Sequence, residues 1–272
     1  MAGVDTVVCY RAPTTVADAG EITAWLRERL DATVEVRDRF LDRRADEGLA
    51  EAFAAARVHS PDERGTGTTM LGAVRYEERA LDEPERAGGV LYDGRAVQRT
   101  LNARLPDAES SLSTLHVVLL NRTLATWGDH DGRWHKRVTV LGQPALVSVP
   151  GVYEAPAKPE AYYEAKQKRA LLSGDAPPRE VLESAVDGDF LVDDDPRTTE
   201  VLKGYVLQAV DYVETGEASC DVESCRLANP HRQPGVVSAQ LRSPEFCDRH
   251  AARYGVSDRA TDSDRATEHD KL

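Results

Sequence analysis

Apolar and polar residues follow one another along the chain in blocks that predict strands and helices in turn. Residues 5–10 form a short apolar run typical of a buried strand, and residues 33–36 alternate as a second strand. Between them, apolar residues recur at helical spacing, with Thr14 or Thr15 as a suitable N-cap. An Ala-rich stretch at 49–58 predicts another helix. This opening implies an α/β (or α+β) fold with a mixed β-sheet and packed helices.

The strongest β pattern lies in the middle of the chain. Residues 114–126 and 134–149 are rich in apolar and β-branched residues and flank a polar turn, 128–132, with a glycine at each end. This pattern predicts a β-hairpin whose loop is longer than two residues. Earlier, a Gly- and Thr-rich stretch at 61–72 predicts a loop, and residues 89–92 predict a strand that leads into a short helix.

Two helices are expected in the second half of the chain. Residues 160–172 form a charged helix in this interpretation. Asp195 followed by Pro196 is a suitable start for the next helix, because proline is tolerated in the first turn and aspartate caps it. Gly216 ends this helix, as a glycine just past a helix commonly does. Its apolar stripe has three-and-four spacing and consists of Val201, Leu202, Tyr205, Val206, Ala209, Tyr212 and Val213.

The length of 272 residues allows one large domain or two small ones. We expect a single domain over residues 1–255 and a disordered acidic tail over residues 256–272, where the sequence SDRAT occurs twice. The N-terminus does not have the form of a signal peptide, and no apolar run approaches 18 residues. The sequence therefore predicts a cytoplasmic protein without a membrane span.

The charge balance is strongly acidic. The net charge is -13, from 47 acidic and 34 basic residues, and aromatic residues make up only 6%. Many carboxylates with few lysines are typical of proteins from halophilic archaea, since a Debye length of about 3 Å in molar salt screens their mutual repulsion. The same balance argues against nonspecific nucleic-acid binding, which needs a basic surface, and against binding to an anionic membrane.

Three of the four cysteines stand close to a histidine near the C-terminus. Cys220 and Cys225 are spaced as C-x4-C, and Cys247 and His250 as C-x2-H. Four such ligands close a tetrahedral zinc site with no open position, which is typical of structural rather than catalytic zinc. The alternatives are unrelated thiols or a Cys220–Cys225 disulfide, although cysteine pairs in a reducing compartment more often hold metal. The fourth cysteine, Cys9, lies in an apolar run.

This arrangement of helix, glycine and cysteines resembles the archaemetzincins, archaeal zinc peptidases of the metzincin clan. Their pattern is H-E-x-x-H-x-x-G-x-x-H-C-x4-C-x-M, followed later by F-C-x2-C. Five residues of this chain fall in register with it: Gly216, Cys220, Cys225, Phe246 and Cys247. His250 replaces the last cysteine, and Leu227 replaces the methionine. The stretches PGVYEAPAKPEAYY, VLKGYVLQAVDY and CRLANPH are also similar to an archaeal family classed as metallopeptidases. The resemblance implies a metzincin-like active-site helix followed by a zinc-bound subregion, residues 216–255.

The resemblance also places the family's catalytic positions on this chain, and they are degenerate. The three histidine ligands correspond to Ala209, Val213 and Ser219, and the catalytic glutamate corresponds to Val210. None of these side chains coordinates zinc usefully or accepts the proton of a zinc-bound water. The nearby carboxylates include no histidine and are expected to form a solvated face: Asp211, Glu214 and Glu217.

Three classes of function follow. The first is a metallopeptidase-like protein with one structural zinc and no standard peptidase catalysis, which acts by binding a peptide or protein along the old substrate strand. The second is an active zinc-dependent hydrolase with a different ligand set, drawn from His116, His130, His135 or His231. His116 is more typical of a packed strand residue, and His130 of a solvated turn. The third is a zinc-ribbon-like nucleic-acid module, against which the acidic charge counts. We favour the first.

Overall fold

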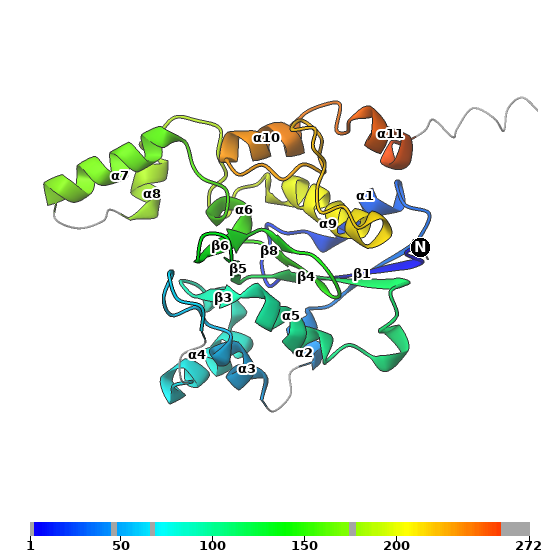
Figure 1. The fold of residues 1–272 in the computed structure, drawn as a ribbon, viewed down its shortest axis with the longest axis horizontal. Coiled ribbons are helices and arrows are strands. Elements are labelled where there is room, and N and C mark those ends of the chain that lie inside the picture. Colours follow the sequence, from blue (N-terminus) through cyan, green and yellow to red (C-terminus); the bar gives the residue numbers. More distant parts are fainter. Residues whose placement is uncertain (1–2, 45–47, 66–68, 174–177, 257–272) are drawn as a thin grey trace, which may run out of the picture.

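A five-stranded sheet forms the middle layer of the protein (Figure 1). The computed structural model describes residues 3–44, 48–65, 69–173 and 178–256. The strands of this sheet, in spatial order, are β2 (Thr33–Arg37), β1 (Thr6–Tyr10), β4 (Thr114–Leu120), β8 (Ala145–Ser148) and β7 (Thr139–Val140). The first four run parallel, and β7 pairs with β8 in the antiparallel direction. The mixed sheet predicted from the sequence is therefore confirmed.

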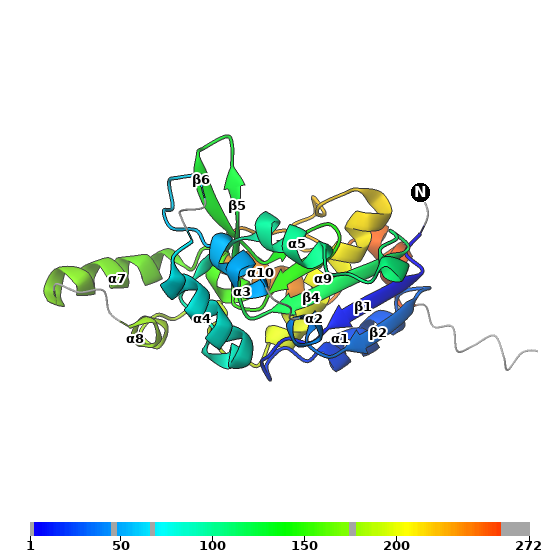
Figure 2. The same cartoon turned by 90° about the horizontal axis from the view of Figure 1, so that it is seen from below.

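A second, three-stranded sheet lies beside the first. It consists of β3 (Leu91–Asp93), β5 (Thr123–Gly128) and β6 (Arg133–Arg137). β5 and β6 form an antiparallel hairpin that projects from the body of the protein in Figure 2. The predicted turn at residues 128–132 is thus confirmed.

The strands expected on either side of that turn were predicted too long. Residues 114–126 contain β4 and β5, which belong to different sheets, and residues 134–149 contain β6, β7 and β8. The break after β4 occurs at Asn121 and Arg122, and the carbonyl of Arg122 accepts a hydrogen bond from the Ser148 hydroxyl (2.6 Å) instead of continuing the ladder. Apolar composition alone does not reveal such a change of sheet.

Helices cover both faces of the large sheet, and each face has its own core. Cys9 and Val117 contact the core of one face, whereas Val8 and Val118 contact that of the other, because neighbouring strand residues point to opposite sides. The first face is covered by α1 (Ala19–Arg27), α6 (Gly151–Glu154), α9 (Thr198–Thr215), α10 (Gln233–Leu241) and α11 (Asp248–Tyr254). The opposite face is covered by α2 (Phe40–Arg44), α3 (Leu49–Ala55), α4 (Leu71–Asp82) and α5 (Gly94–Asn102).

The remaining elements are peripheral. α7 (Glu160–Ser173) and α8 (Arg179–Glu183) extend from one end of the protein in Figure 1. Two short 3-10 helices, Pro84–Arg86 and Asp107–Glu109, lie in connecting loops. No described helix combines the length and apolar character needed to cross a membrane. Most of the tail that was predicted to be disordered lies outside the described residues.

The helix boundaries correct two of the predicted starts. α1 begins at Ala19 rather than after Thr14 or Thr15, because the Asp18 carboxylate accepts hydrogen bonds from the backbone N–H groups of the first turn. α9 begins at Thr198, two residues later than predicted, although Asp195 does accept a hydrogen bond from the Arg197 N–H at 2.9 Å. The predicted end of α9 is confirmed: Gly216 has a left-handed φ of 81°, a conformation that favours glycine.

Candidate functional site

The structure brings the four predicted metal ligands together. Cys220 and Cys225 lie in the loop after α9, Cys247 caps the N-terminus of α11, and His250 lies in the first turn of that helix. Their ligand atoms all lie within 4.8 Å of one another. All four cysteines of the chain, including Cys220 and Cys225, are free thiols. The three cysteines of the cluster are therefore neither scattered nor joined by the alternative disulfide.

The spacing of the donor atoms fits a tetrahedral zinc ion. Zinc with Zn–S bonds of about 2.3 Å and a Zn–N bond of about 2.05 Å places two sulfurs about 3.8 Å apart and sulfur and nitrogen about 3.6 Å apart. The Sγ atoms of Cys220 and Cys247 are 3.8 Å apart, and Nδ1 of His250 lies 3.3 Å from Sγ of both Cys225 and Cys247. Three thiols and one imidazole are also ligand types that zinc prefers.

Backbone N–H groups point at the sulfurs and would stabilise thiolates. The N–H of Val222 donates to Sγ of Cys220 at 3.4 Å. Burial raises the pKa of the Cys225 thiol to about 12, against the effect of backbone hydrogen bonds to it. Burial also opposes ionisation of Cys247, but hydrogen bonds from the backbone of His250 and from Cys220 and Cys225 hold its pKa below the usual value. A bound cation would ionise the buried thiols outright.

The imidazole of His250 is held from its other side by α9. Its Nδ1 faces the sulfurs, and its Nε2 lies 3.9 Å from Oδ2 of Asp211. The hydroxyl of Tyr254 donates a 2.7 Å hydrogen bond to Oδ1 of the same carboxylate. Burial lowers the pKa of His250, which favours the neutral form that binds metal. A carboxylate behind a metal-binding histidine orients the ring and raises its basicity.

The carboxylates near the end of α9 form the predicted solvated face only in part. Asp211 is buried, with 4% of its surface exposed. Glu214 pairs with Arg253 at 2.6 Å, and Glu217 pairs with Arg249 at 2.8 Å. The prediction was wrong for Asp211, because α11, which it did not include, folds back and places the Tyr254 hydroxyl against this carboxylate. Glu217 is exposed, as predicted.

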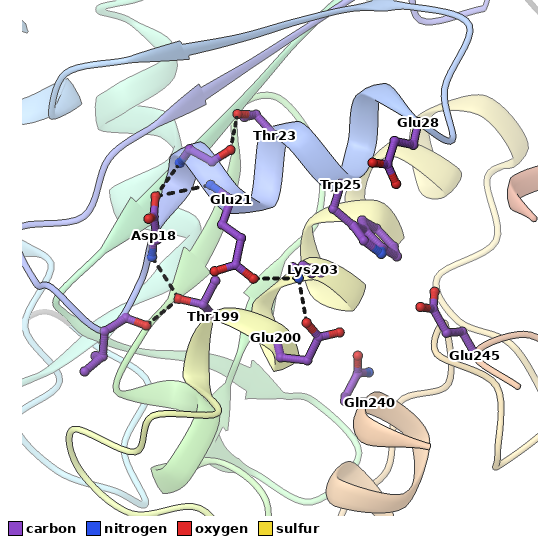
Figure 3. Close-up of polar contacts among 12 residues, drawn as sticks. Asp18, Glu21, Thr23, Trp25, Glu28, Thr199, Glu200, Lys203, Gln240 and Glu245 are labelled. Atoms are coloured by element: carbon purple, nitrogen blue, oxygen red, sulfur yellow. Dashed lines mark hydrogen bonds and ion pairs between the residues drawn. The ribbon is translucent and has the colours of Figure 1, made fainter. Parts of the chain in front are cut away.

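A network of charges around the buried Lys203 connects α1 and α9, as Figure 3 shows. Lys203 lies beside the apolar stripe of α9, with only 7% of its surface exposed. Its Nζ atom pairs with Glu21 of α1 at 2.7 Å and with Glu200 of α9 at 2.5 Å. Thr199 directly precedes Glu200 in α9, and its hydroxyl accepts a hydrogen bond from the Asp18 N–H at 2.9 Å. The sequence signal for this network was a single lysine next to the apolar stripe of α9.

Arg226 extends this network to the cysteine loop. It follows Cys225 directly and is 2% exposed. Its guanidinium pairs with Glu200 and donates to the carbonyl of Gln240 in α10. The Gln240 side-chain amide returns a 2.8 Å hydrogen bond to the Arg226 carbonyl. The candidate metal loop is therefore fastened to α1, α9 and α10 by a residue that spacing alone did not identify.

The positions on α9 that match the family's catalytic residues face the protein interior, whereas Ser219 lies in the loop after α9 and is partly exposed. Ala209 and Val210 are at most 1% exposed and belong to the core between α9 and the sheet, and Val213 packs against that core. The α9 residues that line a surface crevice are instead Tyr205 and Gln208. Ala209 and Val213 do not line this crevice.

This crevice lies between α9 and the strands β6 and β7, with a volume of about 230 Å³. Its charged and titratable lining residues are basic or neutral: Arg95, Lys136, Arg137 and His231. No aspartate or glutamate lines it within the described part of the chain, despite the acidic composition. Burial lowers the pKa of Arg137, and the nearby charge of Arg95 lowers it further. An anion in the crevice would relieve this repulsion.

The other histidines have different environments. His116 is fully buried in β4, where its ring contacts the Tyr10 hydroxyl and the Glu109 carbonyl at 3.1 Å each, as expected for a packed strand residue. His231 is exposed at the crevice. His130 and His135 come together with Asp131 at the tip of the β5–β6 hairpin, and their ligand atoms form a second cluster within 4.8 Å.

A larger cavity of about 1030 Å³ lies at the carboxyl ends of the parallel strands β1, β2, β4 and β8. Its walls carry both signs of charge, from residues that include Arg11, Arg39, Arg179, Asp38 and Asp193. Ligands of parallel sheets commonly bind at this edge. Sequence patterns do not reveal this cavity, because it forms from the ends of four strands that are distant in the chain.

Comparisons with solved structures found an archaemetzincin and a zinc-dependent peptidase at low similarity. An archaemetzincin from Methanopyrus kandleri is similar at 13% identity and a TM-score of 0.42, with 91% of this chain and 92% of that chain covered. A zinc-dependent peptidase from Methanocorpusculum labreanum is similar at 11% identity and a TM-score of 0.44, with 91% and 98% covered. TM-scores below 0.5 do not establish a common fold, so the metzincin-like assignment stays a prediction.

Comparisons of sequence give a family. No curated protein matches the chain. A family model described as "Family of unknown function (DUF7001)" matches residues 8–253, nearly the whole of the described structure. The chain therefore belongs to the DUF7001 family.

Proposed function

We propose that this protein is a metallopeptidase-like zinc protein that holds one structural zinc and acts by binding, without standard peptidase catalysis. The observation that carries the proposal is the contrast between two sets of residues. Cys220, Cys225, Cys247 and His250 form a compact set of four donors. Ala209, Val213 and Ser219, by contrast, offer no set of donors that would hold a second zinc on α9.

The zinc would have a structural role. Four protein ligands leave no position for water, which a catalytic zinc needs. The loop that carries Cys220 and Cys225 and the helix that carries His250 are both attached to α9, through Arg226 and Asp211 respectively. A zinc ion would join these two segments and fix them against the core.

We propose an anionic, extended peptide segment as the bound partner, held in the basic crevice beside β7. β7 is an edge strand of the five-stranded sheet, and a peptide can add to such an edge through its backbone. Arg95 and Arg137 would face an acidic side chain or a terminal carboxylate there. A nucleic-acid partner is disfavoured by the net charge of -13. A cytoplasmic location suits free thiols, which a reducing compartment preserves.

The second candidate function is hydrolysis by a metal held elsewhere. The observation that favours it is the cluster of His130, Asp131 and His135, since three ligands would leave a position for water. His116 cannot join that cluster, because its ring is fully buried and hydrogen-bonded in β4. The cluster also lies on an exposed hairpin tip, where water is not excluded.

Binding to labelled peptides, followed by fluorescence anisotropy in high salt, tests the proposed partner. We expect an acidic peptide to bind more tightly than its neutral and basic counterparts, and Arg137→Gln to weaken binding about 5- to 30-fold, as expected for loss of one charge-assisted hydrogen bond. Arg133→Gln is the matched control, because Arg133 lies on the same strand but outside the crevice lining. Equal affinity for acidic and basic peptides would contradict the proposal.

A further inference from the structure

The tip of the β5–β6 hairpin carries a group of three side chains that the proposed function does not use. Trp127 pairs with Trp134 and Thr126 with His135 across the hairpin. The loop between the strands closes with a hydrogen bond from the Gly132 N–H to the Gly128 carbonyl at 2.8 Å. This tight closure brings His130 and Asp131, in the loop, next to His135 on β6.

The three side chains converge on one point. Nε2 of His135 lies 2.9 Å from Oδ2 of Asp131, and Nε2 of His130 lies 3.7 Å from Oδ1 of the same carboxylate. The two imidazole rings stack with their centroids 5.7 Å apart and an interplanar angle of 13°. One ligand atom from each residue lies within 4.8 Å of the others.

Gly128 leaves room for these side chains because it has no Cβ atom. A Cβ atom on Gly128 would lie 2.5 Å from Oδ1 of Asp131 and 2.8 Å from Nε2 of His135. Any other residue at position 128 would force these two side chains to shift. The glycine therefore permits the convergence, in addition to its place at the end of the strand.

We propose that His130, Asp131 and His135 form a second metal site, for a divalent transition-metal ion such as zinc or nickel. Two imidazoles and one carboxylate are ligands that suit these ions, and the set differs from the thiolate-rich set at the C-terminus. Water or a side chain of another molecule would complete the coordination. The site is independent of the proposed structural zinc, which is held by other elements.

Occupancy of the two sites should differ. The hairpin site has three ligands instead of four, and the His130 side chain is 78% exposed. It should therefore bind metal more weakly and exchange it faster than the Cys3His cluster. After dialysis against a mild chelator we expect only the cysteine site to stay filled, and the hairpin site to fill again when metal is added.

Isothermal titration of zinc into the full-length, zinc-loaded protein tests this assignment. The expected result is one additional ion per chain, with binding weakened about 10-fold or more in His135→Gln and in Asp131→Asn. His59→Ala is the matched control, because His59 is exposed and outside both clusters. Far-ultraviolet circular dichroism and the zinc content of the cysteine site verify that each variant is folded.

Histidine nitrogen resonances provide a second measurement. On addition of zinc, we expect the ring nitrogens of His130 and His135 to shift together and with the same midpoint, while those of His59 do not move. Absence of additional zinc uptake would overturn the proposal. Uptake that His135→Gln leaves unchanged, or that His59→Ala reduces equally, would overturn it as well, since such uptake is adventitious.

Discussion

Gly204, in the middle of α9, provides the sharpest test of how the cysteine loop is fastened to the core. A Cβ atom at this position would meet the side-chain oxygen of Gln240 far inside contact distance, and would lie 2.7 Å from Cγ of Arg226 and 2.8 Å from Cδ of Gln240. Gly204→Ala must therefore displace Gln240, whose amide donates to the Arg226 carbonyl at 2.8 Å. Because Gln240 belongs to α10 and Arg226 to the cysteine loop, both segments would move away from α9.

The size of the effect follows from three contributions. Alanine is favoured over glycine in a helix by about 1 kcal/mol. Overpacking costs about 1–3 kcal/mol, and loss of a buried hydrogen bond costs about 1–3 kcal/mol more. The net destabilisation is then about 1–5 kcal/mol, centred near 3 kcal/mol, which at about 2–4 °C per kcal/mol lowers Tm by about 6–12 °C.

Thermal unfolding in molar KCl, followed by circular dichroism, measures this effect. Gly72→Ala in α4 is the control, because no heavy atom lies within 4 Å of the added Cβ and the site is exposed. We expect the control to unfold at or slightly above the wild-type temperature. A Gly204→Ala protein with wild-type Tm would refute the close packing of α9 against Gln240 and Arg226.

Three further predictions concern the metal loop, pH and salt. Cys225→Ser should raise hydrogen exchange from residue 220 to residue 250 while β5 and β6 stay protected; equal protection in wild type and variant would contradict the zinc assignment. Burial opposes ionisation of Glu200, but the charges and hydrogen bonds of Lys203 and Arg226 outweigh burial and lower the pKa of this carboxyl. The ionised Glu200 therefore stabilises the fold above the usual glutamate pKa, and this stabilisation is lost as pH falls through the lowered pKa. Glu200→Gln should therefore be less stable at pH 7 and lose less stability than wild type between about pH 5 and 3, as urea unfolding would measure. Dilution from molar to about 0.1 M KCl should lower the unfolding midpoint, because the net charge of -13 is then less screened; a constant midpoint would contradict adaptation to high salt.

Sequence patterns predicted those elements whose formation depends on residues close together in the chain. The apolar runs of β1 and β2, the stripe of α9 and its glycine end were all identified correctly, because burial on one side and the left-handed conformation of Gly216 leave a direct trace in the sequence. The pairing of Cys-x4-Cys with Cys-x2-His also predicted a cluster that the structure brings together.

Features that depend on distant segments were not predictable in this way. The change of sheet at Arg122 arises from contacts with Ser148, and the burial of Asp211 arises from Tyr254 in α11. The position of α9 relative to the crevice depends on distant segments as well: Tyr205 and Gln208 line the crevice, whereas Ala209 and Val213 do not. Each of these outcomes was decided by tertiary packing, which periodicity along a single segment does not report.

The zinc content of the purified protein tests the central claim most directly. After dialysis against a mild chelator in high salt, elemental analysis should find one zinc per chain in wild type and none in Cys247→Ser, with no chelator-sensitive hydrolysis of generic peptide substrates in either protein. A single zinc that persists in Cys247→Ser, or peptide hydrolysis that disappears when a strong chelator is added, would contradict a structural Cys3His zinc in a protein that acts by binding.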